Sequence, residues 1–138
     1  MKTFNDIGLN GQILKSLKEM GFEIPTPIQA KAIPHLMSSD QDIIASAQTG
    51  TGKTAAFGLP SIHMTEIDEK VPQTLVMCPT RELCIQIARD LTNFSKYLPG
   101  ILPNKRSESL RPAAIATGVR AFFPVTSPIA KIFSILVF

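Results

Sequence analysis

The sequence predicts an α/β fold, in which a parallel sheet is flanked by helices. A short apolar run at 42–46 leads into a glycine-rich loop that opens a helix. A second apolar run at 74–78 is continuous, as expected of a strand buried on both faces. Helical patterns precede, separate and follow these runs. This order favours parallel strands joined by right-handed crossovers.

Two helices are expected before the first strand. Asn10 can cap the first, and Gly21 stands where a left-handed terminator belongs. Thr26 can cap the second, with Pro27 as its first residue, and Pro34 is expected to end or kink it. The first helix carries apolar residues at helical spacing, namely Leu9, Ile13, Leu14, Leu17 and Met20.

Two more helices follow the two strands. One is expected from Lys53 toward Leu59, with a kink at Pro60. The other begins after Thr80, which can cap it, and the Pro-Gly pair at 99–100 is expected to end it. Its apolar side consists of Leu83, Ile87, Leu91, Phe94 and Leu98.

The composition is that of one globular domain. The chain has 138 residues, of which 44% are hydrophobic and 18% charged. The net charge of +3 arises in 101–138, which holds five Lys and Arg against one acidic residue, whereas 1–100 holds nine against ten. Because the basic surplus is confined to this segment, net charge does not by itself indicate a nucleic-acid partner.

Cysteine spacing and hydropathy indicate the compartment. Cys78 and Cys84 match no metal or redox spacing, so two reduced, partly buried thiols are expected. The sequence has no secretory signal pattern and no apolar run of the roughly 18–20 residues that a membrane span requires. These observations predict a cytoplasmic protein without a membrane partner.

A phosphate-binding loop is the most informative motif. Glycines at 50 and 52 let the backbone turn and aim its N–H groups at anionic oxygens, and the following helix adds its positive end. Lys53 can reach the β- and γ-phosphates, and the Thr54 hydroxyl can ligate Mg²⁺. The alternative is a glycine-rich turn with a surface lysine. The loop consists of Ala47, Gln48, Thr49, Gly50, Thr51, Gly52, Lys53 and Thr54.

Three segments in this order resemble the DEAD-box family of ATP-dependent RNA helicases. The segment 21–29, GFEIPTPIQ, looks like the family's Q motif, and Phe4 lies 17 positions before it, where the family places an isolated aromatic residue. The loop 47–54 has the family's own spelling, with Ala47 in place of the usual first glycine. The segment 79–83, PTREL, looks like the family's first RNA-contacting motif.

The resemblance covers residues 1–99 and implies an incomplete RecA-like P-loop NTPase domain. Within it the Q motif would occupy 4–29, the phosphate loop 47–54 and the RNA-contacting motif 79–83. Residues 100–138 read as a divergent, irregular tail with scattered prolines. A truncated gene, a changed reading frame or a spliced variant would each produce such a tail.

The resemblance also implies a site for ATP and Mg²⁺ that includes Lys53 and Thr54. A glutamine amide is complementary to the N6 and N7 edge of adenine, so Gln29 would read the base, and Phe4 would stack on its face. The alternatives are that Gln29 faces solvent on its helix and that Phe4 is a hydrophobic staple.

RNA is the second implied partner. Pro79, Thr80 and Arg81 would contact the RNA backbone without reading its sequence. The alternative for Arg81 is an ion pair with Glu82 or Asp90.

The resemblance therefore implies an ATP-dependent RNA helicase. The alternative, which we favour for this chain alone, is a non-catalytic nucleotide-binding fragment. The sequence has no Asp-Glu-Ala-Asp motif to anchor Mg²⁺ and position water. A different enzyme with this loop, such as a kinase, is disfavoured by the Gln29 and Arg81 segments. With two evident strands, apolar edges are left uncovered, which predicts marginal stability and aggregation.

Overall fold

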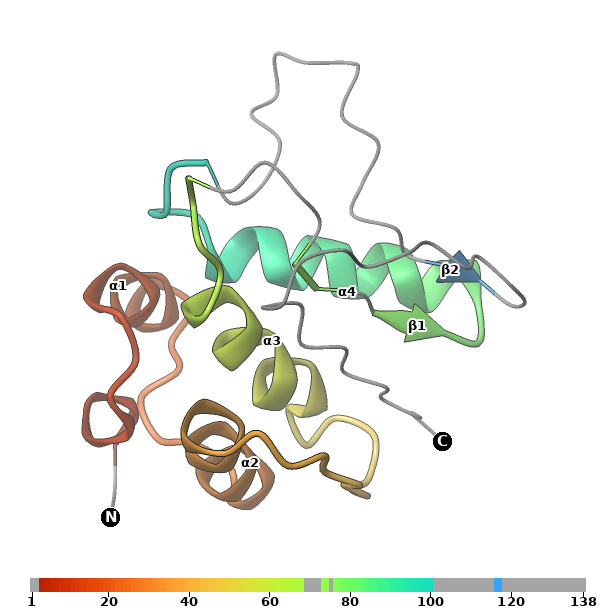
Figure 1. The fold of residues 1–138 in the computed structure, drawn as a ribbon, viewed down its shortest axis with the longest axis horizontal. Helices are drawn as coiled ribbons and strands as arrows, with labels where there is room; N and C mark the ends of the chain where they lie inside the picture. Colours follow the sequence, from red (N-terminus) through yellow and green to blue (C-terminus); the bar gives the residue numbers. More distant parts are fainter. Residues whose placement is uncertain (1–2, 69–72, 75, 101–115, 118–138) are drawn as a thin grey trace.

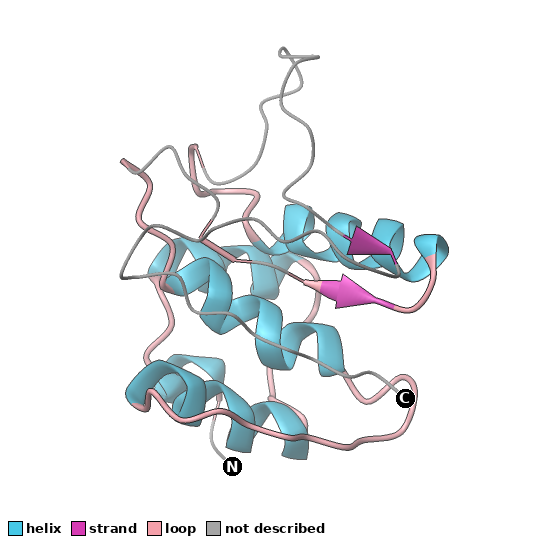
Figure 2. Ribbon diagram, turned by 45° about the vertical axis from the view of Figure 1, so that its right-hand side comes forward, coloured by secondary structure: helices cyan, strands magenta, loops and turns pink. Residues whose placement is uncertain are grey.

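The computed structural model describes residues 3–68, 73–74, 76–100 and 116–117, and these are mostly helical (Figures 1 and 2). None of the helices in these ranges is long and apolar enough to cross a membrane. In chain order the elements are η1 (Phe4–Ile7), α1 (Gly11–Glu19), α2 (Pro27–Ser38), α3 (Lys53–His63), β1 (Met77–Cys78), α4 (Arg81–Phe94) and β2 (Ala116–Thr117).

The start and end of α1 confirm the predicted caps. The side chain of Asn10 accepts a hydrogen bond from the Gln12 N–H at 2.8 Å. Gly21 has φ 76°, and the Phe22 N–H donates to the Leu17 carbonyl at 2.9 Å. This bond and the left-handed glycine form a Schellman ending, which satisfies a carbonyl of the last turn.

Pro34 was expected to end or kink its helix and Pro60 to kink its helix, and neither proline ends the helix that contains it. Helix α2 continues through Pro34 to Ser38, and α3 continues through Pro60 to His63. A proline inside a helix removes one backbone hydrogen bond. In α3 the loss is offset by packing, because the whole stretch 55–62 is buried.

Helix α4 ends earlier than its apolar pattern predicts. It stops at Phe94 rather than at the Pro-Gly pair at 99–100, and turns follow. Leu98, the last residue of the predicted stripe, is nevertheless buried. The apolar pattern therefore predicts which residues are buried beyond the point where the helix ends.

The main core surrounds α3, which lies between α2 and α4 (Figure 1). Ile13 of α1, Ile33 of α2 and Leu59 of α3 are fully buried there. Burying a side chain of this size contributes roughly 1.5–3 kcal/mol. The main core consists of Phe4, Leu9, Ile13, Leu17, Ile33, Ala55, Leu59, Ile62, Phe94 and Leu98.

A second core lies between α3, β1 and α4 and contains both cysteines. Both are free and buried, as predicted. Burial, together with the neighbouring Cys84 thiol, raises the pKa of the Cys78 thiol to about 11. The members of this core are Phe57, Val76, Cys78, Cys84 and Ile87.

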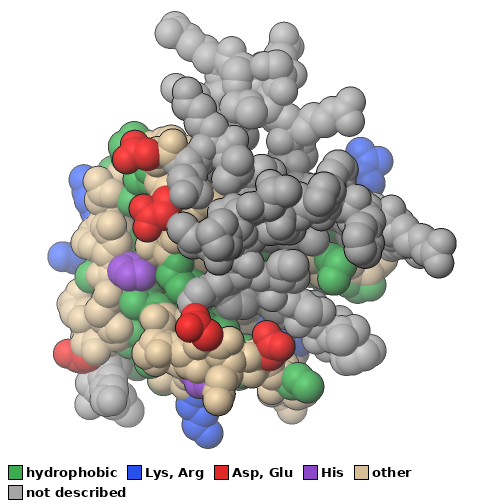
Figure 3. Space-filling view, viewed as in Figure 1, with side chains coloured by type: hydrophobic (Ala, Val, Ile, Leu, Met, Phe, Trp, Pro, Cys, Tyr) green, Lys and Arg blue, Asp and Glu red, His purple; other side chains and the backbone are tan. Residues whose placement is uncertain are grey.

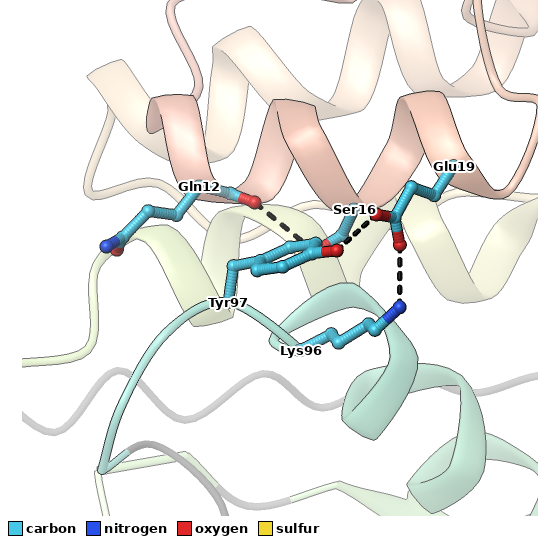
Figure 4. A network of polar contacts seen from close by, with 5 residues as sticks. All are labelled: Gln12, Ser16, Glu19, Lys96 and Tyr97. Carbon is cyan, nitrogen blue, oxygen red and sulfur yellow. Dashed lines mark hydrogen bonds and ion pairs between the residues drawn. The ribbon is translucent and has the colours of Figure 1, made fainter.

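A polar contact joins the end of α1 to the turn after α4 (Figure 4). The Lys96 ammonium lies 2.7 Å from a Glu19 carboxylate oxygen, and the Tyr97 hydroxyl donates to the other oxygen. The Lys15 ammonium lies 4.0 Å from the centre of the Tyr97 ring. The hydrogen bond from Lys96 lowers the pKa of Glu19. We call these four residues the α1–α4 clasp.

The strands depart most from expectation. The predicted strand at 42–46 is not formed, and Ile44 is fully exposed at 102%. Strand β1 covers two residues of the run expected at 74–78. It pairs in parallel with β2, Met77 opposite Ala116 and Cys78 opposite Thr117.

The physical reason is that a strand forms only beside a neighbour that accepts its backbone hydrogen bonds. Within the described part of the chain, only β2 pairs with β1, and nothing pairs with 42–46. Strand β2 comes from the segment predicted to be irregular. The rest of that prediction, 101–115 and 118–138, lies outside the described residues.

Candidate nucleotide site

The phosphate loop keeps the backbone that its glycines predict. Gly50 has φ 82° and Gly52 has φ 81°, which are left-handed conformations that favour glycine. The Thr51 hydroxyl donates to the Gln48 carbonyl at 2.7 Å, which closes the turn. Gly52 is the N-cap of α3, so the loop ends at the positive end of that helix.

Lys53 and Thr54 are the first two residues of α3, and both are half-buried. The Lys53 ammonium donates to the Ala47 carbonyl at 2.8 Å, so this side chain folds back along the loop. Its charge therefore lies beside the glycine turn and the helix end. This is the combination that binds phosphate groups.

Gln29 of α2 lies against this loop. It is 5% exposed, so the alternative of a solvent-facing residue is wrong. Its Oε1 accepts from the Thr26 N–H at 2.9 Å, and its Nε2 donates to the Gly52 carbonyl at 3.1 Å. A primary amide has two N–H groups and two lone pairs. One N–H and one lone pair thus remain, which is the pair that the adenine edge requires.

Glycine is required at position 52 because Gln29 lies close to it, as well as because its φ is positive. A Cβ added at Gly52 would lie 2.2 Å from Nε2 of Gln29, closer than side-chain atoms come to one another. The fit between α2 and the loop therefore depends on the absence of a side chain at this position.

Thr26 is a site residue that the sequence predicted only as a helix cap. Its hydroxyl donates to the Thr51 carbonyl at 2.9 Å. The three-residue spacing from Thr26 to Gln29 is that of a capping box, so the sequence carried a signal for their mutual contact. It carried none for the bond to a loop residue 25 positions away.

Phe4 occupies a different environment from the one its predicted role needs. Its ring is 3% exposed and belongs to the main core with Ile33 of α2. An adenine would need one face of that ring to be open. This burial favours the alternative of a packing residue, and stacking on a base stays a prediction.

The segment 79–81 links β1 to α4 and is exposed. The Thr80 hydroxyl accepts from the Leu83 N–H at 3.3 Å, which confirms the predicted cap. Arg81 is the first residue of α4, and among the described residues it pairs with neither Glu82 nor Asp90. The phosphate loop and the start of α4 lie at the same end of the molecule in both ribbon views (Figures 1 and 2).

The described surface carries charges of both signs and no cluster of metal ligands. Basic and acidic side chains are mixed over the described surface in Figure 3, without one continuous basic patch on that face. No group of three His, Cys, Asp or Glu side chains that could hold a metal occurs in the described ranges. A Mg²⁺ ion at Thr54 would therefore take most of its ligands from phosphate oxygens and water, as Mg²⁺ commonly does.

Comparison with known sequences identifies a family. Residues 26–118 match the family described as DEAD/DEAH box helicase. The match reaches past residue 100, where divergence was expected, so the boundary at residue 99 stays a prediction. The chain is 50% identical over 99 residues to the ATP-dependent RNA helicase DeaD of Escherichia coli and 53% identical over 98 residues to that of Haemophilus influenzae.

Solved structures agree in fold. Saccharomyces cerevisiae Dbp5 bound to RNA and ADP BeF3 matches 70% of this chain with a TM-score of 0.68 and 35% identity. A DEAD box protein from Methanococcus jannaschii matches 67% with a TM-score of 0.64 and 38% identity. The fold of this chain therefore corresponds to part of a domain in these two DEAD-box proteins. The match to the Escherichia coli relative spans 72% of this chain and 16% of that relative. The chain covers 25% of the length of each of the two solved structures.

Proposed function

We propose that this chain, which belongs to the DEAD/DEAH box helicase family and corresponds to its N-terminal portion, is the ATP-binding part of an RNA helicase. The loop 47–54 holds the phosphates. Gln29 reads the adenine. Lys53 neutralises the β- and γ-phosphates, and Thr54 ligates Mg²⁺.

One observation carries this proposal. Gln29 and Gly52 are 23 positions apart, yet the Gln29 amide donates to the Gly52 carbonyl at 3.1 Å. The side chain suited to the base and the loop suited to the phosphates are thus in contact. A base and a triphosphate chain belonging to one nucleotide can reach both.

The amide also supports a preference for ATP over GTP. Adenine offers a donor and an acceptor at N6 and N7, whereas guanine offers two acceptors at O6 and N7. The remaining N–H and lone pair of Gln29 match adenine. With guanine, the lone pair would face another acceptor.

RNA is the proposed second ligand, at the segment 79–81. It is exposed at the start of α4, where the helix end and the Arg81 guanidinium favour a phosphate. The yeast Dbp5 structure is described as bound to RNA. Because the chain spans about 16% of its curated relatives, unwinding is proposed for a whole helicase. The chain alone is proposed to bind nucleotide without hydrolysing it.

Calorimetric titration of the full chain with ATP and GTP, in the presence of Mg²⁺, tests the proposal. We expect ATP to bind more tightly than GTP, and Lys53→Ala to weaken ATP binding at least tenfold, as loss of a charge-assisted hydrogen bond implies. Lys18→Ala is the matched control, because Lys18 is an exposed lysine on α1, away from the loop. Equal affinity of the two lysine variants would refute the phosphate role.

Phosphate release measured with and without RNA distinguishes a chain that only binds ATP from a chain that also hydrolyses it. No release above the buffer rate supports a binding fragment. RNA-stimulated release that Lys53→Ala abolishes would mean that the chain hydrolyses ATP by itself, contrary to the absence of an Asp-Glu-Ala-Asp motif.

A further inference from the structure

We propose that Cys78 and Cys84 form a disulfide site beneath the segment 79–83, and that closing this bond weakens RNA binding by that segment. The bond is inferred from two free thiols that the structure brings together in one core. Its effect on RNA rests on the proposed function, because it concerns the segment 79–81 that is proposed to hold RNA. The sequence contains no other cysteine.

Local structure turns both cysteine side chains toward the interior. Burial alternates along β1, so Met77 is exposed and Cys78 is buried. Cys84 lies in the first turn of α4, on the same buried face as Ile87 three positions further on. A short turn joins β1 to α4 (Figure 1), and the two elements pack against each other. Both sulfur atoms therefore enter the second core.

The two thiols are direct neighbours in this core. Cys78 and Cys84 are each 5% exposed, and their thiols share a hydrogen bond. The other members of the core carry no polar atom, namely Phe57, Val76 and Ile87. Each thiol therefore has the other as its chemical partner within the second core.

Burial keeps this pair reduced while the fold is closed. The attacking species in disulfide exchange is a thiolate, and Cys78 holds its proton at neutral pH because its pKa is raised to about 11. A small disulfide also reaches the sulfur atoms only when the turn between β1 and α4 opens. Oxidation is therefore expected to be slow in the folded chain and to report on that opening.

The oxidant in this proposal is a small-molecule disulfide, such as oxidised glutathione. One protein thiol loses its proton, and its sulfur attacks the small disulfide, breaking the S–S bond and releasing one small thiolate. The second protein thiol loses its proton and attacks the protein sulfur of the resulting mixed disulfide. This step forms the bond between Cys78 and Cys84 and releases the second small thiolate. The two protons pass to the two released thiolates, so two protein thiols are oxidised and one small disulfide is reduced.

Closing the bond would move the segment between the two sulfur atoms. Bonded sulfur atoms lie about 2.0 Å apart, which is closer than two hydrogen-bonded thiols. The first turn of α4 is therefore pulled toward the end of β1. The Thr80 hydroxyl accepts from the Leu83 N–H at 3.3 Å, which is already long for such a bond, so this cap is expected to break first. Arg81 lies between these two residues, so its guanidinium shifts as well.

Mass spectrometry tests the disulfide site. The reduced full chain is incubated in buffer with oxidised glutathione, and the remaining free thiols are then alkylated. We expect a chain that is lighter by two hydrogens and takes up no alkyl group. Because the sequence has two cysteines, an intrachain disulfide can only join this pair. A product that carries glutathione alone, or a disulfide-linked dimer alone, would overturn the inference.

The unfolded chain supplies the control, because cysteines six positions apart can also pair in a flexible chain. The same oxidation is followed in urea, and circular dichroism compares the product formed in buffer with the reduced chain. We expect matching spectra and slower oxidation in buffer than in urea, since the folded thiols are buried. The inference is wrong if the bond forms only in urea or only with loss of the helical spectrum.

The effect on RNA is measured with a fluorescein-labelled oligouridylate, titrated with the reduced chain, the oxidised chain and the oxidised chain after renewed reduction. We expect oxidation to weaken binding by about threefold to tenfold, the range for one hydrogen bond, and reduction to restore it. The double variant Cys78→Ala and Cys84→Ala, treated with the same oxidant, should keep the affinity of the reduced chain. An equal loss in the double variant, or no loss in the oxidised chain, would contradict the effect on RNA.

The outcomes keep this inference apart from the proposed function. If the reduced chain binds RNA but forms no intrachain disulfide, the inference fails while the proposed RNA site stands. If the disulfide forms but the reduced chain binds no RNA, the proposed RNA site fails together with the effect on RNA, and the measured mass alone supports the disulfide site.

Discussion

In the described part of the chain, the predicted helices form almost completely, whereas the predicted strands hardly form at all. Helices α1, α2 and α4 begin at predicted N-caps, and all four helices contribute to the main core. The segment 42–46 forms no strand and is mostly exposed, and β1 is two residues long. A helix satisfies its backbone hydrogen bonds within itself, but a strand depends on neighbours. The difference between helices and strands shows that part of a domain can keep its helices where its strands do not form.

The phosphate loop belongs with the helices in this comparison. It follows the unformed strand, yet its glycines are left-handed and its carbonyls contact α2. Its shape thus comes from the α2–α3 contact rather than from a sheet. The loop conformation is therefore kept although the predicted strand before it does not form.

The largest expected effect is in the helical core. Leu59→Ala removes a fully buried side chain of α3 and should lower the free energy of unfolding by about 2–5 kcal/mol. Ile44→Ala is the matched control in the segment 42–46, where exposure of the side chain predicts a change within about 0.5 kcal/mol. Urea denaturation measures both. A large loss from Ile44→Ala would mean that 42–46 is a buried strand in solution.

An alkaline titration tests the region where β1 meets α4. The folded state keeps the Cys78 proton up to a pKa of about 11, whereas the unfolded thiol loses it near 9.0. Between these values the folded state binds more protons, so the free energy of unfolding should fall as pH rises, by at most about 3 kcal/mol.

Cys78→Ala is the control for this titration, because other groups also ionise at high pH. The difference in stability between the two proteins should be constant below pH 9.0 and should shrink as pH rises toward 11. A constant difference across the window would show that Cys78 is not buried, and the strand end would then be as open as Ile44.

A smaller loss is expected where α3 and α4 touch. A Cβ added at Gly58 would lie 2.5 Å from a methyl of Leu91, so Gly58→Ala should cost about 1–3 kcal/mol. Gly11→Ala, where open space surrounds the added carbon, should cost nothing measurable. Thermal unfolding compares the two. Equal melting temperatures would mean that the helices pack less closely than described.

The smallest effect is expected at the α1–α4 clasp. Lys96→Met removes the ion pair with Glu19, but both side chains are exposed, so the melting temperature should change little. Any change should vanish in about 1 M salt, which screens exposed charges. Lys18→Met controls for the loss of one charge. A large fall in melting temperature that salt does not remove would mean that the α1–α4 clasp stabilises the fold as much as a core contact does.

The sequence predicted the helical part of the fold well because its signals are local. Asn10, Gly21 and Thr80 lie at the helix ends that their side chains and backbones specify. The early end of α4 and the passage of α2 and α3 through prolines were not predictable, since they depend on packing. The strand predicted at 42–46 does not form, because its apolar pattern indicates a buried environment that the described residues do not supply.

The candidate site likewise has features that the sequence predicted and features that it did not. The left-handed glycines at 50 and 52 follow from the motif. The Thr26 bond to Thr51 joins residues 25 positions apart and has no local signal. Phe4 is buried in the main core, and its role at a base stays a prediction, because an isolated aromatic residue has the same sequence signature whether it faces a ligand or a core.

The main core has a consequence for cleavage of the backbone. It contains Leu59 of α3 and Phe94 of α4, which lie on opposite sides of the connection at 69–72. A protease that cuts once in this connection would leave two peptides held by the same apolar contacts. The cut protein should then run as two bands on a denaturing gel and as a single particle in gel filtration.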